Sequence, residues 1–405
     1  MTDPIIIVGA SQAGVQVAES LRQEGFDGPL LLIGDETHPP YQRPPLSKAL
    51  LTGETTEDRL VLRGRDLLAK KNIELVTGAR VEAIERAGRR VRLADGRDLA
   101  YHGLALATGG RARALPIPGA DLDGVVTLRT IEDSRRIAAG IAQAACVAVV
   151  GGGFIGLEIA AAARKTGKSV VVFEALDRLL ARSSAPFVSD FFLSLHGACG
   201  VDVRLGAQIA AIEGKNGRVA AVVTRDGASH PADLVVVGVG IVPNGELAQA
   251  SGIACDRGII VDDCSRTSDP AVAAAGDCTA RRMADGALLR LESVQNAIEQ
   301  AKSAAAALLG KSRPFTAAPW FWSDQFDVRL QMAGLSAGHD RIAVRGSPAE
   351  RKFSVFYFRG ERLIAVDSVN RAPDHIAARR LLDAGKSPSF AQAQDEGFAL
   401  ATLLR

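Results

Sequence analysis

The sequence lacks the cysteine pattern of a disulfide-bonded or metal-binding protein. It has 5 cysteines, and no two of them form a C-x-x-C or C-x4-C pair. An odd number at irregular spacing indicates neither a disulfide framework nor an iron–sulfur or zinc site. We therefore expect no metal ion, and we expect all the cysteines to be buried without a chemical role. They are Cys146, Cys199, Cys255, Cys264 and Cys278.

Long apolar runs and a strong net charge are also absent. No apolar run approaches the roughly 20 residues that span a bilayer, and the net charge of +2 argues against a nucleic-acid partner. The first strand begins by Ile5, which leaves no room for a signal peptide. We expect a cytoplasmic protein, a monomer or weak dimer, that binds neither membranes nor nucleic acid. Its 405 residues exceed a single hydrophobic core, so two or three domains are expected.

Two glycine-rich turns organise the chain. Each lies between an apolar strand and a helix of small residues: residues 9–14 read GASQAG, and residues 151–156 read GGGFIG. The absent side chains let the backbone approach a pyrophosphate, whose charge then lies at a helix N-terminus. Two such turns indicate two dinucleotides on one chain. An enzyme that binds both most simply passes a hydride between them.

An acidic residue follows the second strand of each dinucleotide unit. Asp35 comes after the strand Leu30–Ile33, and Glu174 ends the strand Ser169–Phe173. Such a carboxylate accepts hydrogen bonds from a ribose, and Glu174 would repel the 2′-phosphate of NADPH. We therefore expect a preference for NADH, which the nearby Arg178 would soften. The alternative for Asp35 is an acid in a solvated turn.

Residues 39–48 form a proline-rich segment, PPYQRPPLSK. Its prolines exclude a helix and a regular strand, so a stiff extended loop is predicted. Such a loop would lay Pro45 against a flat ring and direct Arg43 and Lys48 toward a cofactor. The alternative is a rigid connection on the surface.

The remaining chain predicts further α/β structure and a change of composition near its end. Helices are expected over about 14–24 and about 292–309. Beyond Pro314 both tryptophans fall within residues 319–322. Apolar residues that alternate along 353–357 predict an antiparallel sheet, with helices after it. We therefore expect a separate C-terminal α+β domain.

The order of these motifs resembles the pyridine-nucleotide-dependent flavoproteins over nearly the whole chain. The resemblance includes both glycine-rich turns, the ATG sequence at 107–109 and the Gly-Asp pair at 276–277. Residues 43–48 and 320–325 most resemble bacterial ferredoxin reductases of the putidaredoxin reductase type, which serve haem-thiolate monooxygenases and ring-hydroxylating dioxygenases. The chain lacks the redox cysteine pair of disulfide reductases and the flavin-facing cysteine of peroxidase-type NADH oxidases. Both of those subfamilies are disfavoured.

The resemblance implies an α/β protein in which an NAD-binding domain is inserted into a split FAD-binding domain. Both domains would be Rossmann-like, with an α+β domain at the C-terminus. The FAD-binding domain would cover residues 1–112 and 240–314, the NAD-binding domain 113–239, and the C-terminal domain 315–405. FAD and NADH are the expected cofactors.

The resemblance also assigns cofactor contacts residue by residue. Asp35 would bind the adenosine ribose, Val81 the adenine and Asp277 the ribityl chain. The backbone N–H of Val294 would face the flavin pyrimidine and stabilise negative charge there, and Trp322 would cover part of the flavin. The full FAD set is Gly9, Ser11, Ala13, Gly14, Asp35, Arg43, Pro45, Lys48, Val81, Ala107, Thr108, Gly109, Arg129, Asp277, Val294 and Trp322. The NAD set is Gly151, Gly153, Phe154, Ile155, Gly156, Glu158 and Glu174.

Two positions in the FAD set carry a reservation. Ser11 stands where the family pattern has a second glycine, so its Cβ narrows the approach to the pyrophosphate. Its hydroxyl can hydrogen-bond a phosphate, and the other FAD motifs are present, so FAD binding is still expected. The alternative for Trp322 is a packed core tryptophan.

Lys48 and Glu158 are the predicted catalytic residues. Hydride transfer requires the nicotinamide C4 close to the flavin N5, held in position and shielded from water. A Lys48 cation near N5 would favour the anionic reduced flavin, and the resemblance assigns Glu158 as its paired carboxylate. Pairing offsets the cost of burying that carboxylate. The alternative for Glu158 is an acid that the helix dipole favours.

The resemblance implies that the electrons leave to a [2Fe–2S] ferredoxin. We expect an acidic partner that docks transiently on arginines at the flavin edge, and the alternative is a set of scattered solvated charges. The expected patch consists of Arg63, Arg65, Arg290 and Arg329. Two other functions stay open at this point: an NADH-binding flavoprotein that resembles apoptosis-inducing factor, and a reductase of rubredoxin or another acceptor.

Overall fold

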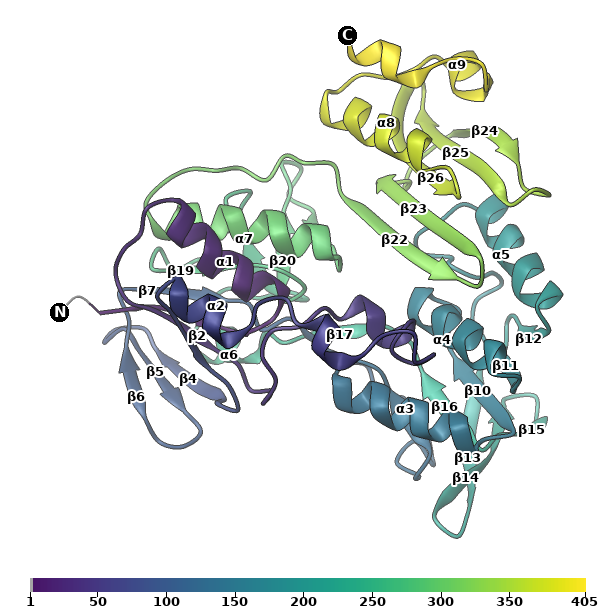
Figure 1. The fold of residues 1–405 in the computed structure, drawn as a ribbon, viewed down its shortest axis with the longest axis horizontal. Helices are drawn as coiled ribbons and strands as arrows, with labels where there is room; N and C mark the ends of the chain where they lie inside the picture. The colour runs from purple at the N-terminus through teal and green to yellow at the C-terminus, as the bar shows by residue number, and fades with distance from the viewer. Residues whose placement is uncertain (1–2) are drawn as a thin grey trace. The chain divides into compact units, whose positions relative to one another are not determined.

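The chain divides into two compact units, each built from segments that are distant in sequence. In the computed structural model, which describes residues 3–405, the first unit comprises residues up to 42, 58–111 and 242–319. The second unit comprises residues 43–57, 112–241 and 320–405. Each unit combines sheets with helices (Figure 1). The second unit groups residues 43–57 and the C-terminal residues 320–405 with the inserted residues 112–241. The division into three domains that the sequence indicates therefore stays a prediction.

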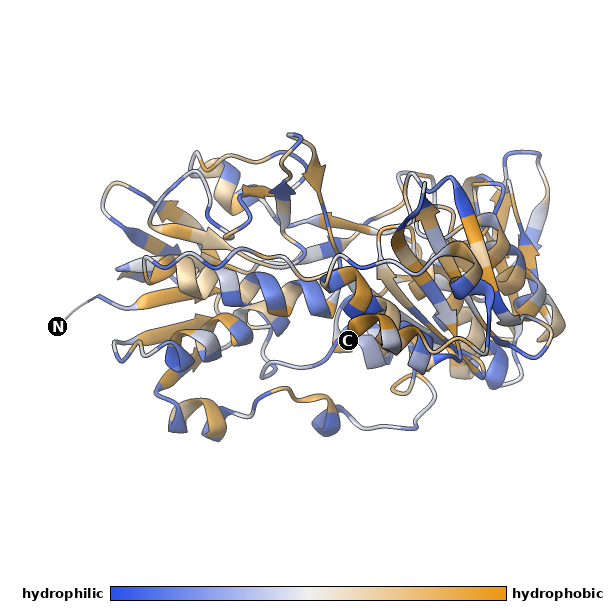
Figure 2. Cartoon of the chain, turned by 90° about the horizontal axis from the view of Figure 1, so that it is seen from above, coloured by the Kyte–Doolittle hydropathy of each residue, from blue (hydrophilic) through white to orange (hydrophobic). Residues whose placement is uncertain are grey.

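A five-stranded parallel sheet forms the centre of the first unit. Its strand order is β19-β7-β1-β2-β3, with β1 paired to both β2 and β7. The continuous apolar sequences of β1 and β2 are typical of parallel strands buried on both faces, and Figure 2 shows these strands as hydrophobic. The strands are β1 (Ile5–Val8), β2 (Leu30–Ile33), β3 (Ile73–Val76), β7 (Gly103–Leu106) and β19 (Val272–Ala274).

Each face of this sheet contributes to its own hydrophobic cluster. Ile5 and Ile7 pack with α1 (Gln12–Gln23) and α7 (Val294–Leu308), and these two helices lie side by side. Ile6 and Val8 point to the other face of the sheet, where they pack with a three-stranded antiparallel sheet, β4-β5-β6. Its strands are β4 (Val81–Glu85), β5 (Arg90–Leu93) and β6 (Asp98–Ala100). Both faces of the central sheet are thereby covered.

Shorter helices and strands complete the first unit, and some of them lie where the chain crosses from one unit to the other. The helices are η2 (Glu57–Leu60), α2 (Arg65–Lys70) and α6 (Glu246–Ala250). The strands are β8 (Gly110–Ala112), β17 (Ile241–Pro243), β18 (Ile259–Val261), β20 (Thr279–Arg282) and β21 (Leu288–Leu289).

The second unit contains another five-stranded parallel sheet, in the order β12-β11-β10-β16-β9. Its strands are β9 (Val125–Thr127), β10 (Cys146–Val150), β11 (Ser169–Phe173), β12 (Val201–Arg204) and β16 (Leu234–Val237). The helices are α3 (Ile131–Gln143), α4 (Phe154–Lys165) and α5 (Pro186–Ala198). A small antiparallel sheet consists of β13 (Ile209–Lys215), β14 (Arg218–Thr224) and β15 (Ser229–Pro231). The repeated strand–turn–helix arrangement gives the chain its second Rossmann-like sheet.

An antiparallel sheet of order β22-β23-β26-β25-β24 forms the C-terminal part of the second unit. Its strands are β22 (Trp320–Gln325), β23 (Val328–Gly334), β24 (Arg341–Ser347), β25 (Lys352–Arg359) and β26 (Arg362–Val369). The helical elements are α8 (Ala372–Asp383), α9 (Phe390–Gln394) and η3 (Leu400–Leu404). Strand β25 is buried on both faces: Phe356 packs toward α8, while Phe353 contacts Phe191 of α5. The predicted antiparallel sheet is therefore present.

The structure corrects two expectations. Residues Pro44–Ser47 form a 3₁₀ helix, η1, so the prediction of an extended loop is wrong there; proline fits the first turn of a helix, where its missing N–H needs no partner. Cysteine burial was also overstated, because Cys146, Cys199 and Cys255 are only half-buried. Among residues 3–405, no helix is long and apolar enough to cross a membrane.

Candidate functional site

The first glycine-rich turn is shaped by contacts that leave no room for a side chain. Gly9 has φ +113°, and a Cβ there would lie 2.1 Å from the carbonyl oxygen of Ala107. A Cβ on Gly14 would lie 1.9 Å from the carbonyl oxygen of Gly9. Ser11 is the N-cap residue of α1, yet its hydroxyl makes no capping hydrogen bond, and the first turn of α1 has no acidic residue. This helix N-terminus therefore fits the negative charge of a pyrophosphate.

Five of the other FAD residues predicted in the first unit follow strands of the same sheet. Asp35 lies just beyond β2, Ala107, Thr108 and Gly109 follow β7, and Asp277 follows β19. Parallel strands place their carboxyl ends at one edge, which is where such sheets bind nucleotides. Ala13 and Gly14 are buried near the start of α1, and Val81 and Val294 are the first residues of β4 and α7.

Two residues that the sequence reasoning missed hold this edge together. Asn244 donates from Nδ2 to the carbonyl of Thr108 over 2.9 Å, and Thr108 Oγ1 donates to the Asn244 carbonyl over 2.6 Å. Gln300 Oε1, on α7, accepts from the backbone N–H of Gly276 over 2.8 Å. No motif marks these side chains, because each one stabilises backbone that is distant in sequence.

The second glycine-rich turn repeats the same local geometry. Gly151 has φ +111°, and a Cβ there would lie 2.5 Å from the carbonyl oxygen of Gly238. A Cβ on Gly156 would lie 2.1 Å from the carbonyl oxygen of Gly151. Gly153 is the N-cap residue of α4, which begins with Phe154 and Ile155 and has no acidic residue in its first turn. This turn also fits a dinucleotide pyrophosphate.

Glu174 lies against the second turn, as a ribose-binding carboxylate requires. Its Oε2 accepts from the Gly152 N–H over 2.6 Å, and its Oε1 accepts from the Leu176 N–H over 2.8 Å. Arg178 does not compete for this position. Its guanidinium donates to the carbonyls of Ala181 and Ser184 and to Ser189 Oγ, over 2.6, 2.7 and 2.9 Å. Its hydrogen bonds hold the loop after β11.

Lys48 and Glu158 form an ion pair within the second unit. Lys48 Nζ lies 2.8 Å from Glu158 Oε2, and the two side chains are 18% and 3% exposed. Glu158 lies one turn inside α4, and Lys48 follows η1, which α3 holds through a hydrogen bond from Ser134 Oγ to the Leu46 carbonyl over 2.9 Å. Ser47 Oγ also donates to Glu158 Oε2, over 2.5 Å. The predicted pairing is thus present in the structure.

Ser323 completes the surroundings of this carboxylate, and the sequence reasoning missed it. Its hydroxyl donates to Glu158 Oε1 over 2.6 Å from β22. Both carboxylate oxygens are therefore hydrogen-bonded, which offsets much of the cost of burying the charge. Period-two alternation along 320–325 is the available signal, because it places Phe321, Ser323 and Gln325 on the face opposite Trp322.

The remaining predicted FAD residues belong to the second unit. Arg43 Nη1 donates to the carbonyl of Arg129 over 2.5 Å, and Pro45 lies in η1. Trp322 is half-buried, with its ring centroid 5.6 Å from that of Trp320. Their contact with FAD stays a prediction.

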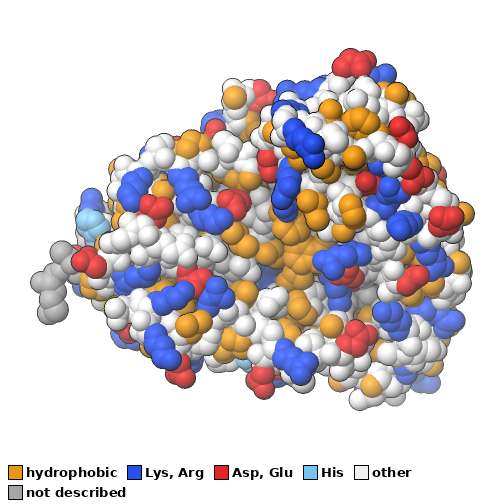
Figure 3. Space-filling model, turned by 45° about the horizontal axis from the view of Figure 1, so that its top comes forward, with side chains coloured by type: hydrophobic (Ala, Val, Ile, Leu, Met, Phe, Trp, Pro, Cys, Tyr) orange, Lys and Arg blue, Asp and Glu red, His pale blue; other side chains and the backbone are white. Residues whose placement is uncertain are grey.

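The four arginines of the predicted docking patch each have a polar partner. Arg63 pairs with Glu19 at 2.8 Å, Arg290 with Glu292 at 2.6 Å and Arg329 with Asp324 at 3.7 Å, and Arg65 donates to Thr77 Oγ1 over 2.5 Å. Their convergence on one surface stays a prediction. On the face drawn in Figure 3, positive and negative side chains are interspersed.

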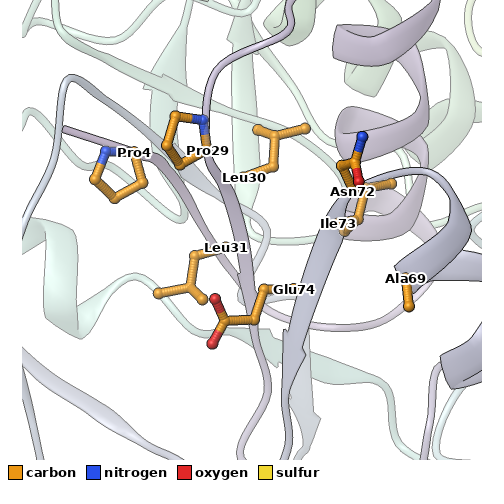
Figure 4. Close-up of a pocket in the computed structure, with 8 residues that line it drawn as sticks. All are labelled: Pro4, Pro29, Leu30, Leu31, Ala69, Asn72, Ile73 and Glu74. Carbon is orange, nitrogen blue, oxygen red and sulfur yellow. The ribbon is translucent and has the colours of Figure 1, made fainter. Parts of the chain in front are cut away.

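A groove of about 480 Å³ lies at the other edge of the first parallel sheet (Figure 4). It is lined by Pro4, Pro29, Leu30, Leu31, Ala69, Asn72, Ile73 and Glu74. Leu30 and Ile73 begin β2 and β3, so the groove lies at the amino ends of the strands. It is therefore distinct from the edge that carries the glycine-rich turn.

Comparison with known proteins decides the family. Residues 3–301 match the model of the pyridine nucleotide-disulphide oxidoreductases, and residues 320–404 match the reductase C-terminal model. The chain belongs to the pyridine nucleotide-disulphide oxidoreductase family. This membership confirms the predicted fold class and the predicted FAD-dependent oxidoreductase that uses NAD(H).

Individual relatives match along almost their full length. Rhodocoxin reductase from Rhodococcus erythropolis is 46% identical over 397 residues, which cover 98% of this chain and 93% of the relative. Putidaredoxin reductase CamA from Pseudomonas putida is 45% identical over 386 residues, covering 94% and 92%. The solved ferredoxin reductase of the CYP199A2 system from Rhodopseudomonas palustris is 44% identical, with a TM-score of 0.96 over 99% of both chains. The predicted resemblance is confirmed.

Proposed function

We propose that this protein is an NADH:ferredoxin reductase that transfers electrons from NADH through FAD to a [2Fe–2S] ferredoxin of an oxygenase system. The relatives named above are, by name, a rhodocoxin reductase, a putidaredoxin reductase and the ferredoxin reductase of the CYP199A2 system. The observation that carries the proposal is the ion pair between Lys48 and the buried Glu158, which lies one turn inside the helix that follows the second glycine-rich turn. It supplies a fixed cation beside a dinucleotide turn, and residues 39–48 contain no cysteine that would do thiol chemistry.

The residues of the chain supply position and charge rather than acid–base chemistry. Bound FAD accepts two electrons together and can release them singly. Glu158 holds the Lys48 ammonium in place, and a fixed cation stabilises negative charge that develops on the flavin ring. Because both Glu158 oxygens are hydrogen-bonded, little reorganisation is needed during the reaction.

Glu174 supports NADH as the electron donor. Its carboxylate lies against the second glycine-rich turn, where the adenosine ribose of a dinucleotide binds. A 2′-phosphate would meet this negative charge, and Arg178 already donates to the Ala181 and Ser184 carbonyls of its own loop and to Ser189 of α5. We expect kcat/KM for NADH to exceed that for NADPH by about 100-fold, which corresponds to about 2.7 kcal/mol.

The acceptor is proposed to be an acidic ferredoxin that docks weakly. Arg290 and Arg329 keep side chains 24% and 58% exposed, so both can meet a negative partner. Their existing partners, Glu292 and Asp324, offset part of the positive charge at each arginine. Partly offset charges favour fast, transient association, which a one-electron carrier needs because each ferredoxin must leave after reduction.

Steady-state kinetics tests the proposal. The purified protein, saturated with FAD, is supplied with NADH or NADPH and with ferricyanide, an acidic [2Fe–2S] ferredoxin or rubredoxin as acceptor. We expect turnover with NADH and ferredoxin, and much slower turnover with rubredoxin. Faster turnover with rubredoxin would assign the other acceptor. Ferricyanide reduction without turnover on either protein would favour a binding flavoprotein instead.

A further inference from the structure

A chain of buried polar side chains continues from Glu158 on the side away from Lys48. Beyond Ser323, Gln325 Nε2 donates to Ser323 Oγ over 3.1 Å. Gln325 Oε1 lies 2.8 Å from His196 Nε2, on α5. Ser323 and Gln325 are each 1% exposed, and His196 is fully buried. A polar chain of this length inside a protein costs free energy unless every member is hydrogen-bonded.

The donors of this chain all point toward the carboxylate. His196 Nδ1 has no hydrogen-bond partner within residues 3–405, so the ring proton belongs on Nε2, where Gln325 Oε1 accepts it. Burial lowers the pKa of His196, although its hydrogen bond with Gln325 acts in the opposite direction, so burial favours the neutral ring. The Gln325 amide then donates to Ser323, and the Ser323 hydroxyl donates to Glu158. One orientation of every group makes all three hydrogen bonds from His196 to Glu158 at the same time.

Local structure fixes the geometry of these residues. Ser323 and Gln325 lie two positions apart on β22, so their side chains share one face. Phe326 turns the chain into β23 with φ +56°. Its ring meets the His196 ring edge-on, with centroids 5.1 Å apart. The hairpin thus holds Gln325 between the histidine and the serine.

We propose that Ser323, Gln325 and His196 are positioning residues for hydride transfer. They fix the rotamer of Glu158 and, through it, the Lys48 ammonium relative to the bound nicotinamide and flavin. This inference rests on the proposed function, because it concerns the same site. Within residues 3–405, Ser323 is the hydrogen-bond donor found on Glu158 Oε1, whereas Oε2 has both Ser47 and Lys48. Without Ser323 the carboxylate can rotate, and the ammonium rotates with it.

Two variants test the inference by anaerobic stopped-flow reduction of the FAD-loaded enzyme with NADH. Ser323→Ala removes the donor to Glu158 and should slow flavin reduction about tenfold, as expected for a lost hydrogen bond to a charged group. Gln325→Glu removes the donor to Ser323 and turns its hydroxyl away from Glu158, so it should slow reduction at least as much. Both variants should retain FAD and reach half-saturation at nearly the wild-type NADH concentration.

The flavin midpoint potential provides a readout independent of turnover. It should become more negative in both variants, because a displaced ammonium stabilises the reduced anionic ring less. Ser323→Thr keeps the hydroxyl and should restore the rate to within about twofold of wild type. Ser354→Ala is the matched control: Ser354 is fully buried on β25 of the same sheet, and its hydroxyl is hydrogen-bonded to Asp374 Oδ2 and to Ser368 Oγ, each over 3.0 Å.

Ser354→Ala should lower the free energy of unfolding without changing the rate of flavin reduction or the flavin midpoint potential. Wild-type rate and potential in both Ser323→Ala and Gln325→Glu would overturn the inference. Equal slowing by Ser323→Ala and Ser354→Ala would overturn it as well, because the effect would then be general loosening. A wild-type enzyme that is reduced by NADH but does not reduce ferredoxin would refute the proposed acceptor alone, since this test stops at the flavin.

Discussion

Breaking the ion pair from either side should have unequal consequences for stability. Lys48 Nζ and Glu158 Oε2 lie 2.8 Å apart, and their side chains are 18% and 3% exposed. At an effective dielectric constant of about 20, two charges at this distance attract by about 6 kcal/mol, and desolvation offsets much of that attraction. Because the Glu158 carboxylate is the more deeply buried partner, removing Lys48 should lower the free energy of unfolding more than removing Glu158 does.

The magnitudes follow from what each variant leaves behind. Lys48→Met leaves the Glu158 carboxylate with only the hydroxyls of Ser47 and Ser323, and should cost about 3 kcal/mol. Glu158→Gln leaves an ammonium that reaches water and the Pro44 carbonyl, 3.3 Å away, and should cost about 1 kcal/mol. The double variant leaves no charged side chain at either of these two positions. It should cost about 1.5 kcal/mol, well below the sum of the single variants.

Urea unfolding measures this double-variant cycle. Fluorescence reports on the relevant unit, because both tryptophans of the chain lie on β22 beside Ser323. All four proteins are compared at the same saturating FAD concentration, so that cofactor binding contributes similarly. Equal costs for the single variants, with an additive double variant, would show that no coupled buried pair exists.

Three further outcomes are expected. Gly9→Ala should lose bound FAD, seen as loss of the flavin absorbance in folded protein, because its Cβ would lie 2.1 Å from the Ala107 carbonyl oxygen at φ +113°; normal FAD content would refute the close-approach argument. Burial raises the pKa of Asp367 to about 7, so the folded protein holds a proton that the unfolded chain releases between about pH 4 and 7. Stability should therefore fall as pH rises through this window, by at most about 1.4 kcal/mol per unit, and Asp367→Asn should remove that part of the slope; an unchanged slope in urea unfolding would contradict it. Ferredoxin turnover should fall with ionic strength more steeply than ferricyanide turnover, and Arg65→Glu with Arg290→Glu should raise the ferredoxin KM; an unchanged KM would remove the predicted patch.

The glycine-rich turns and the buried parallel strands could be predicted from the sequence, because local backbone geometry determines them. Gly9 and Gly151 mark turns in which a Cβ would meet a carbonyl oxygen within 2.5 Å, so glycine spacing reports the geometry directly. The apolar sequences of β1 and β11 identify buried parallel strands for the same local reason. The Lys48–Glu158 pairing came from the family resemblance, and the structure contains it.

Long-range polar contacts could not be predicted in this way. Ser323, Gln325 and His196 come from β22 and α5, and only the folded chain brings them to Glu158. The segment Pro44–Ser47 shows a different limit, because proline permits both an extended loop and the first turn of a helix. Local sequence cannot choose between them, whereas the contacts of η1 with α3 and α4 do.

The central claim is that this protein takes two electrons from NADH and passes them one at a time to a ferredoxin. The most direct test is anaerobic: the FAD-loaded protein is reduced with one equivalent of NADH and then mixed with excess oxidised [2Fe–2S] ferredoxin. Absorbance and electron paramagnetic resonance count the reduced ferredoxin. The account predicts two reduced ferredoxins for each NADH, with the flavin returning to its oxidised spectrum. Flavin that NADH reduces but that stays reduced in the presence of ferredoxin would contradict it.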